Sequence, residues 1–85
     1  MPLQVTLVSA EAEVWSGEAT LVVAKTVEGE IGFMAGHEPL LAILASGQVR
    51  ITLPTGEKIT ADAADGFVSV ENDRVTIVAG EAALV

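Results

Sequence analysis

Residues 66–79 read GFVSVENDRVTIVA and form two apolar runs joined by a short polar link. In the second run, 74–79, apolar and polar residues alternate, which is the period of a β-strand with one face in water. The first run, 66–70, is richer in valine, as expected of a strand near the centre of a sheet. Asn72 and Asp73 tolerate positive φ angles, so the whole stretch predicts a β-hairpin.

The same pattern continues on both sides of this hairpin. Residues 3–7 and 49–53 alternate like 74–79, and 21–24 is valine-rich like 66–70. A second polar link, TG at 55–56, joins two more strand-like runs. Such turn signals, recurring about every eight to twelve residues without the spacing of βαβ units, predict an all-β fold, an antiparallel β-sandwich.

Residues 38–47, EPLLAILASG, fit two readings. Pro39 suits the first position of a helix and Gly47 suits a helix end. The run is too short for an independent helix and lies between strand signals, so a strand or bent strand is favoured.

The chain has 85 residues and a net charge of −8. We expect a single β-sandwich domain over residues 1–85, and a domain this small buries only about 60% of the surface that its unfolded chain exposes, which favours a partner. The first 49 residues carry six glutamates against the single base Lys25. Nucleic acid is therefore a poor partner and a basic protein surface a better one, unless the acidity serves solubility alone.

The chain has no cysteine, which excludes disulfides and thiol nucleophiles and fits a reducing compartment. The first residues lack a basic region followed by a long apolar run, so no signal peptide is expected, and no apolar run approaches the ~18 residues of a membrane span. Any membrane association is expected to go through a partner.

Residues 28–41, EGEIGFMAGHEPLL, hold the only histidine and several glycines and glutamates. HEPLL lacks the second histidine of H-E-x-x-H, and the glycine spacing fits no phosphate loop. No serine lies in a nucleophile context that His37 would serve as base. We therefore expect no enzymatic activity of the chain itself, no cofactor and no metal; a carboxylate-based hydrolase remains a minor alternative.

The glycines and Pro39 shape residues 28–41 as a bent, exposed loop. Its apolar side chains and acidic rim suit a protein-binding site. The alternative is a loop that folds its apolar side chains into the core while the glutamates are merely solvated. The apolar side chains in question are Ile31, Phe33 and Met34, and the acidic ones are Glu28, Glu30 and Glu38.

Residues 29–41, GEIGFMAGHEPLL, resemble the GE-x-G-x-x-PGH-x-PLL segment of the epsilon subunit of F-type ATP synthase, which is called delta in mitochondria. VTLVSAEAEVWSGEA (5–19) resembles the first strands of that family, and DGFVSVENDRVTIVAGEA (65–82) resembles a later segment. The resemblance covers essentially the whole chain in the right order.

The resemblance implies a two-sheet sandwich of about ten short strands and a non-catalytic subunit of the central rotor. Such a subunit links the gamma subunit to the ring of c subunits and couples proton-driven rotation to ATP synthesis, peripherally on the cytoplasmic face of the bacterial cell membrane. The c-ring contacts implied are Glu28, Glu30, Ile31 and Phe33, and the gamma-subunit contacts are Ser9, His37, Leu41 and Ala42. We expect His37 to hydrogen-bond rather than to transfer protons. An unrelated β-sandwich adaptor or ligand-binding module is the alternative.

The sequence departs from the family pattern at three positions. Ala35 replaces the usual proline, which predicts a more mobile loop. Glu38 stands where a small residue is common, and Asp65 replaces a glycine, which puts the turn geometry there in doubt. Family members usually continue as a helical hairpin that can block ATP hydrolysis. With the sequence ending at Val85, we expect this hairpin to be absent and the chain to support coupling without braking hydrolysis.

Overall fold

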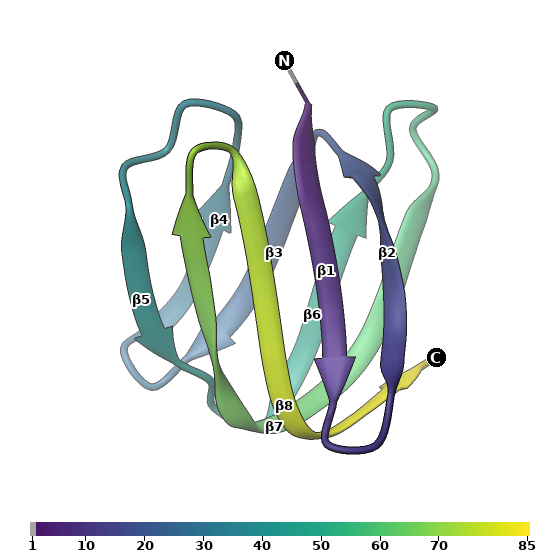
Figure 1. The fold of residues 1–85 in the computed structure, drawn as a ribbon, viewed down its shortest axis with the longest axis vertical. Helices are drawn as coiled ribbons and strands as arrows, with labels where there is room; N and C mark the ends of the chain where they lie inside the picture. Colours follow the sequence, from purple (N-terminus) through teal and green to yellow (C-terminus); the bar gives the residue numbers. More distant parts are fainter. Residues whose placement is uncertain (1) are drawn as a thin grey trace.

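A computed structural model describes residues 2–85 as an all-β fold without a helix (Figure 1). The predicted fold class is therefore confirmed. None of the described residues form a helix that could cross a membrane. The strands are β1 (Leu3–Ser9), β2 (Glu13–Ala19), β3 (Leu21–Thr26), β4 (Gly29–Phe33), β5 (Leu40–Ile43), β6 (Gly47–Thr52), β7 (Lys58–Glu71) and β8 (Arg74–Leu84).

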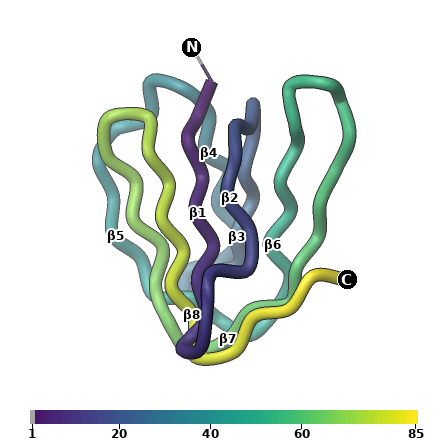
Figure 2. Tube along the Cα trace, turned by 45° about the vertical axis from the view of Figure 1, so that its right-hand side comes forward, coloured from purple at the N-terminus to yellow at the C-terminus, as the bar shows by residue number. Residues whose placement is uncertain are grey.

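The strands form one continuous hydrogen-bonded path that folds into two layers. Its order is β2-β1-β8-β7-β6-β3-β4, and β5 pairs with β7. β7 and β8 belong to both layers: residues 66–71 of β7 pair with 74–79 of β8, and residues 61–64 pair with 81–84. Figure 2 shows the two strands crossing together between the layers at the base of the sandwich.

We name the layers by the view of Figure 1. The front sheet holds β2, β1, the first half of β8, the second half of β7, and β5; the back sheet holds β4, β3, β6 and the remaining halves of β7 and β8. The expected ten strands are these eight, with β7 and β8 counted once in each sheet.

One pairing differs from the antiparallel expectation. β1 runs parallel to β8, with Val5 beside Val75 and Ile77 beside Leu7. No tight turn fixes the relative direction of these two strands, because they lie at opposite ends of the sequence. Parallel pairing needs a long connection, and here the rest of the chain provides it.

The core consists of the inward side chains of both sheets, and their period of two matches the sequence pattern. Phe33, Leu3, Leu7, Ile51 and Ile77 are the largest fully buried side chains. Burying one such side chain contributes about 1.5–3 kcal/mol relative to leaving it in water. These contacts between the inner faces hold the two sheets together.

Two of the predicted turns are confirmed by their backbone angles. Asn72 and Asp73 have φ angles of 50° and 60°, and positive φ at both central positions is the type I′ geometry of a two-residue hairpin. Gly56, in the link between β6 and β7, has a φ of 95°. Residues 40–43 form strand β5, so the strand reading of 38–47 is confirmed over its central part.

The bend of β7 lies at Asp65 and Gly66. Asp65 adopts a φ of 61°, a left-handed conformation that aspartate tolerates better than most residues, so the replacement of the family's glycine is accommodated. A Cβ on Gly66 would lie 1.7 Å from the carbonyl oxygen of Val78. The two strands therefore approach each other at the bend more closely than any side chain would permit.

Gly66→Ala should destabilise the domain by about 3 kcal/mol or more, because the backbone of β8 has to move away. Gly32→Ala is the matched control, since its added Cβ would meet only ordinary contacts at 3.7 Å. We expect the control to change the free energy of unfolding by less than about 0.5 kcal/mol. Urea unfolding measures both; equal stability of the two variants would contradict the close approach at Gly66.

Candidate docking surfaces

A row of apolar side chains crosses the outer face of the front sheet. Ile43 of β5 pairs with Phe67 of β7, Phe67 with Val78 of β8, and Val78 with Val8 of β1. Paired residues of neighbouring strands present their side chains on the same face. We call these four residues the outer row; with adjacent strands about 4.8 Å apart, it extends about 14 Å across the sheet.

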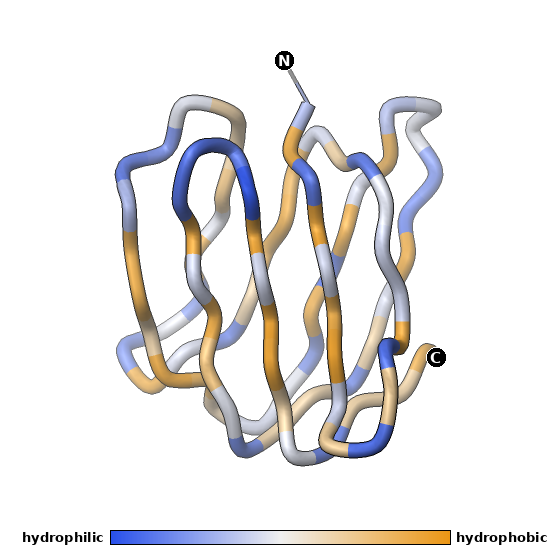
Figure 3. Tube along the Cα trace, in the orientation of Figure 1, coloured by the Kyte–Doolittle hydropathy of each residue, from blue (hydrophilic) through white to orange (hydrophobic). Residues whose placement is uncertain are grey.

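The outer row faces solvent because its sequence neighbours fill the core. Val68 and Ile77 are fully buried, so the adjacent Phe67 and Val78 point the opposite way. Ile43 is 62% exposed and Phe67 40% exposed. Figure 3 looks onto this face and shows hydrophobic positions on β5, β8 and β1. The other two members of the row are half-buried, so the exposed apolar surface is concentrated at Ile43 and Phe67. Neighbouring exposed apolar side chains of this kind mark a binding surface.

The same face becomes polar toward the β7–β8 turn. Two shallow hollows of about 560 and 400 Å³ lie there, and both include Arg74 and Thr76. Ser69 and Glu71 line one hollow, and Thr6 contributes to the other. The face thus combines an apolar half with a polar margin, which is the usual composition of a protein interface.

The outer row was not predicted from the sequence, although the sequence contains a signal for it. Leu7-Val8, Phe67-Val68 and Ile77-Val78 are adjacent apolar pairs within strands. Because successive side chains of a strand point to opposite faces, one member of each pair has to face outward. The sequence does not give the register between neighbouring strands. It therefore could not show that the outward side chains of these pairs line up in one row.

The structure separates the four gamma-subunit contacts that were expected from the family. Leu41 is 71% exposed and lies on the same face of β5 as Ile43. Ala42 lies on the opposite face of β5, half-buried against the core. Ser9 ends β1 at the bottom of Figure 1, whereas His37 lies in the connection to β5 at the top.

Ser9 and His37 each make local bonds. The Ser9 hydroxyl donates to the carbonyl oxygen of Ala12 (3.1 Å) and accepts the backbone N–H of Glu11 (3.3 Å), which closes the β1–β2 turn. The His37 ring stands edge-on to Phe33, with 5.1 Å between ring centroids. Its Nδ1 lies 2.7 Å from the carbonyl oxygen of Glu38.

The c-ring contacts expected from the family lie on the β3–β4 hairpin and only partly at the surface. Glu28 and Glu30 are exposed, and Ile31 is half-buried against the core. Phe33 is fully buried, so its assignment as a contact is wrong. Residues 29–33 form edge strand β4 rather than the expected loop, and alternation along β4 points both apolar side chains inward.

Glu30 has a partner within the chain. Its Oε2 lies 3.0 Å from Nη2 of Arg50, and both side chains are about half-exposed (56% and 48%). An exposed pair of this kind contributes about 0.2–1 kcal/mol. Glu28 lies at the hairpin tip, where its backbone N–H donates to the Thr26 hydroxyl at 3.2 Å.

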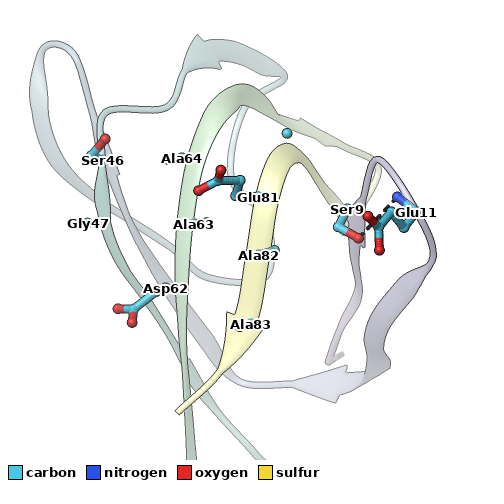
Figure 4. A pocket seen from close by; sticks show the side chains of 11 residues that line it. Ser9, Glu11, Ser46, Gly47, Asp62, Ala63, Ala64, Glu81, Ala82 and Ala83 are labelled. Atoms are coloured by element: carbon cyan, nitrogen blue, oxygen red, sulfur yellow. Dashed lines mark hydrogen bonds between the residues drawn. The ribbon is translucent and has the colours of Figure 1, made fainter.

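A third surface feature is a hollow of about 430 Å³ near the bend of β7 and β8 (Figure 4). Its ionisable lining groups are the carboxylates of Glu11, Asp62 and Glu81. In Figure 4 these carboxylates lie apart rather than converging on one point. Among residues 2–85 no group of three or more potential ligands is placed to hold a metal ion. The hollow therefore gives the hydrolase alternative no support.

Comparison with known proteins identifies the family. A profile of the ATP synthase delta/epsilon chain β-sandwich domain matches residues 2–85. The chain belongs to this family. It is 49% identical over 82 residues to the ATP synthase epsilon chain of Micrococcus luteus, covering 96% of this chain and 90% of that one. It is 45% identical over 84 residues to that of Frankia casuarinae, covering 99% of both.

Other epsilon chains are longer. The chain is 49% identical over 77 residues to that of Streptomyces avermitilis but spans only 62% of its length. Among solved structures, a chain of the Euglena gracilis mitochondrial ATP synthase, described as OSCP/F1/c-ring in rotational state 1, matches with a TM-score of 0.92 and 27% identity, over 98% of this chain and 53% of that one.

A chain from the central stalk/c-ring structure of the Tetrahymena thermophila mitochondrial ATP synthase matches with a TM-score of 0.78. The identity is 19%, over 96% of this chain and 66% of that one, and it shows the shared fold alone. The family resemblance inferred from the sequence is confirmed by the profile match. The outer row and the acidic β3–β4 hairpin therefore both lie on a delta/epsilon β-sandwich.

Ile43→Gln should leave the free energy of unfolding of the isolated domain within about 0.5 kcal/mol, because the side chain is already in water. Ile77→Gln should cost about 3 kcal/mol or more, because it buries an amide in an apolar core. Urea unfolding of the two variants compares an outward with an inward isoleucine of the same sheet. A large loss of stability for Ile43→Gln would contradict the outward orientation of the row.

Proposed function

We propose that the chain is a non-catalytic subunit of the ATP synthase rotor that links the gamma subunit to the c ring. The outer row carries this proposal, because four strands align outward apolar side chains, two of them exposed and two half-buried, on a domain of the delta/epsilon family. The Euglena assembly that contains the similar chain includes F1 and the c-ring. The chain would transmit rotation driven by protons without carrying out chemistry itself.

A linking subunit needs two separate contact surfaces, and the sandwich offers two. We assign the outer row and Leu41, on the front sheet, to the gamma subunit. We assign the acidic β3–β4 hairpin, on the back sheet, to the c ring. The exposed carboxylates of Glu28 and Glu30 fit a basic partner surface. The two surfaces adjoin where the N–H of Val27 donates to the carbonyl oxygen of Ile43 at 3.0 Å, and the sandwich that carries both would transmit torque from one partner to the other.

The proposed assignment also implies a location in the cell. The partner at the membrane would be the c ring, so the chain would lie peripherally on the cytoplasmic face of the bacterial membrane as part of the complex. Its function there would be to hold two partners in a fixed geometry. Apolar side chains at the centre of an interface supply affinity, and the charged hairpin supplies orientation and partner choice.

Mixing the purified chain with its cognate gamma subunit should give a complex that co-migrates in gel filtration. Phe67→Ser should weaken this complex about tenfold or more, because it truncates a central apolar contact. Leu84→Gln is the matched control, since Leu84 is 50% exposed but lies on the back sheet. Absence of a complex with the unmodified chain at both low and moderate salt would reject the proposed function.

Glu28→Lys should weaken attachment to the c ring more than attachment to gamma, because it places a cation against a basic surface. The effect should be largest at low salt, since exposed charge pairs contribute only about 0.2–1 kcal/mol and are screened. Glu57→Lys changes the net charge equally on the β6–β7 turn, at the other end of the sandwich (Figure 1). Pull-down on c rings measures both variants; equal behaviour would show that the hairpin faces another partner.

A further inference from the structure

Asp73 joins three segments that are distant in the sequence. Its carboxylate Oδ1 accepts the backbone N–H of Gly36 at 2.7 Å, and its backbone carbonyl accepts the N–H of Gln4 at 2.8 Å. Asp73 itself belongs to the β7–β8 turn, Gly36 to the connection between β4 and β5, and Gln4 to β1. Figure 1 shows the β7–β8 turn beside the β4–β5 connection at the top of the molecule.

Besides this bond, the β4–β5 connection, residues 34–39, is held mainly by His37, whose ring packs edge-on against Phe33 and whose Nδ1 lies 2.7 Å from the carbonyl oxygen of Glu38. Met34 is 63% exposed, and Ala35 and Gly36 are exposed as well. Inside the connection, the N–H of His37 donates to the carbonyl oxygen of Met34 at 3.2 Å. Segments with few buried contacts open most easily, and Ala35 lacks the conformational restriction that a proline would impose. The bond from Asp73 ties this segment to the rigid β7–β8 hairpin.

The connection leads directly into β5, which begins at Leu40 and presents two exposed side chains, Leu41 and Ile43. β5 is short and lies at the edge of the front sheet, where it pairs with β7, and at its end the carbonyl oxygen of Ile43 accepts the N–H of Val27 at 3.0 Å. The order of residues 34–39 therefore affects how firmly the first half of β5 is held. A surface that is already ordered loses less conformational entropy when a partner binds.

We propose that Asp73 is a positioning residue: through its bond to Gly36 it holds residues 34–39 and preorganises the first half of β5, with the exposed Leu41, for docking. The part that concerns docking rests on the proposed function, with the gamma subunit as partner. The part that concerns residues 34–39 does not depend on any partner. Asp73 acts through the connection and β5.

Position 73 allows turn formation to be separated from this bond. Its φ of 60° is open to Gly, Asn and Asp, the residues that favour type I′ turns. Asn keeps a side-chain oxygen that can accept the Gly36 N–H but removes the charge. Gly removes the acceptor and places an Asn-Gly pair, a strongly preferred hairpin turn, at the two central positions. The two variants thus test the bond while the hairpin stays intact.

The experiment compares Asp73→Gly and Asp73→Asn in the full chain. We expect Asp73→Gly to keep or raise the urea midpoint of unfolding. Its Gly36 amide should exchange hydrogen at least about tenfold faster, and its affinity for the gamma subunit should fall on the order of 3–10-fold. Asp73→Asn should stay close to the unmodified chain in both exchange and affinity, because the acceptor remains.

Three results would overturn the proposal or part of it. Unchanged Gly36 exchange in Asp73→Gly would show that the bond does not hold the connection. Equal loss of affinity in both variants would show that the charge of Asp73, rather than its bond, matters. Faster exchange without any loss of affinity would reject preorganisation of the docking edge. If the unmodified chain does not bind gamma, the proposed function and the docking part fail together, and the exchange measurement alone decides the positioning of residues 34–39.

Discussion

The fold depends on the close approach of β7 and β8 where they bend together between the sheets. A Cβ on Gly66 would lie 1.7 Å from the carbonyl oxygen of Val78, so a glycine is required at this point. The same two strands pair in both layers, with 66–71 against 74–79 in front and 61–64 against 81–84 behind. Because the hairpin is continuous, its register fixes the placement of the strands that pair with it.

The outer row is a direct result of that shared register. Phe67 and Val78 are opposite each other just beyond the bend, and Ile43 and Val8 extend the row through the strands on either side. The inward neighbours of these residues fill the core. One surface of the hairpin therefore stabilises the sandwich while the opposite surface stays available for a partner.

The acidic hairpin and the outer row lie on different sheets, which suits a subunit held between two partners. The two surfaces adjoin at one corner, where the N–H of Val27 donates to the carbonyl oxygen of Ile43 at 3.0 Å. The apolar row would supply affinity and the carboxylates orientation. The 34–39 connection lies between these surfaces in sequence and is tied to the β7–β8 turn by Asp73. The β7–β8 turn and the 34–39 connection thus set the geometry of edge strand β5, whose outer side chains are not part of the core.

The all-β class, the hairpin turn at Asn72-Asp73 and the family could all be predicted from the sequence. Each depends on local signals: the period of two along a strand, residues that accept positive φ, and motifs in a fixed order. The sequence also suggested the acidic surface, since Glu28 and Glu30 carry their charge wherever they lie. It could not decide whether Phe33 faces a partner or the core, and the structure places it fully inside.

The parallel pairing of β1 with β8, the outer row and the bond from Asp73 to Gly36 could not be predicted and appear only in the folded molecule. All three bring together residues that are far apart in the chain, and strand alternation fixes faces without fixing which strands are neighbours. In the sequence, Val8 and Ile43 each look like an ordinary strand residue. Only the register of the paired strands brings them into one row. A partner surface on a sheet is built from side chains of several paired strands, whereas the sequence pattern describes only the alternation within each strand.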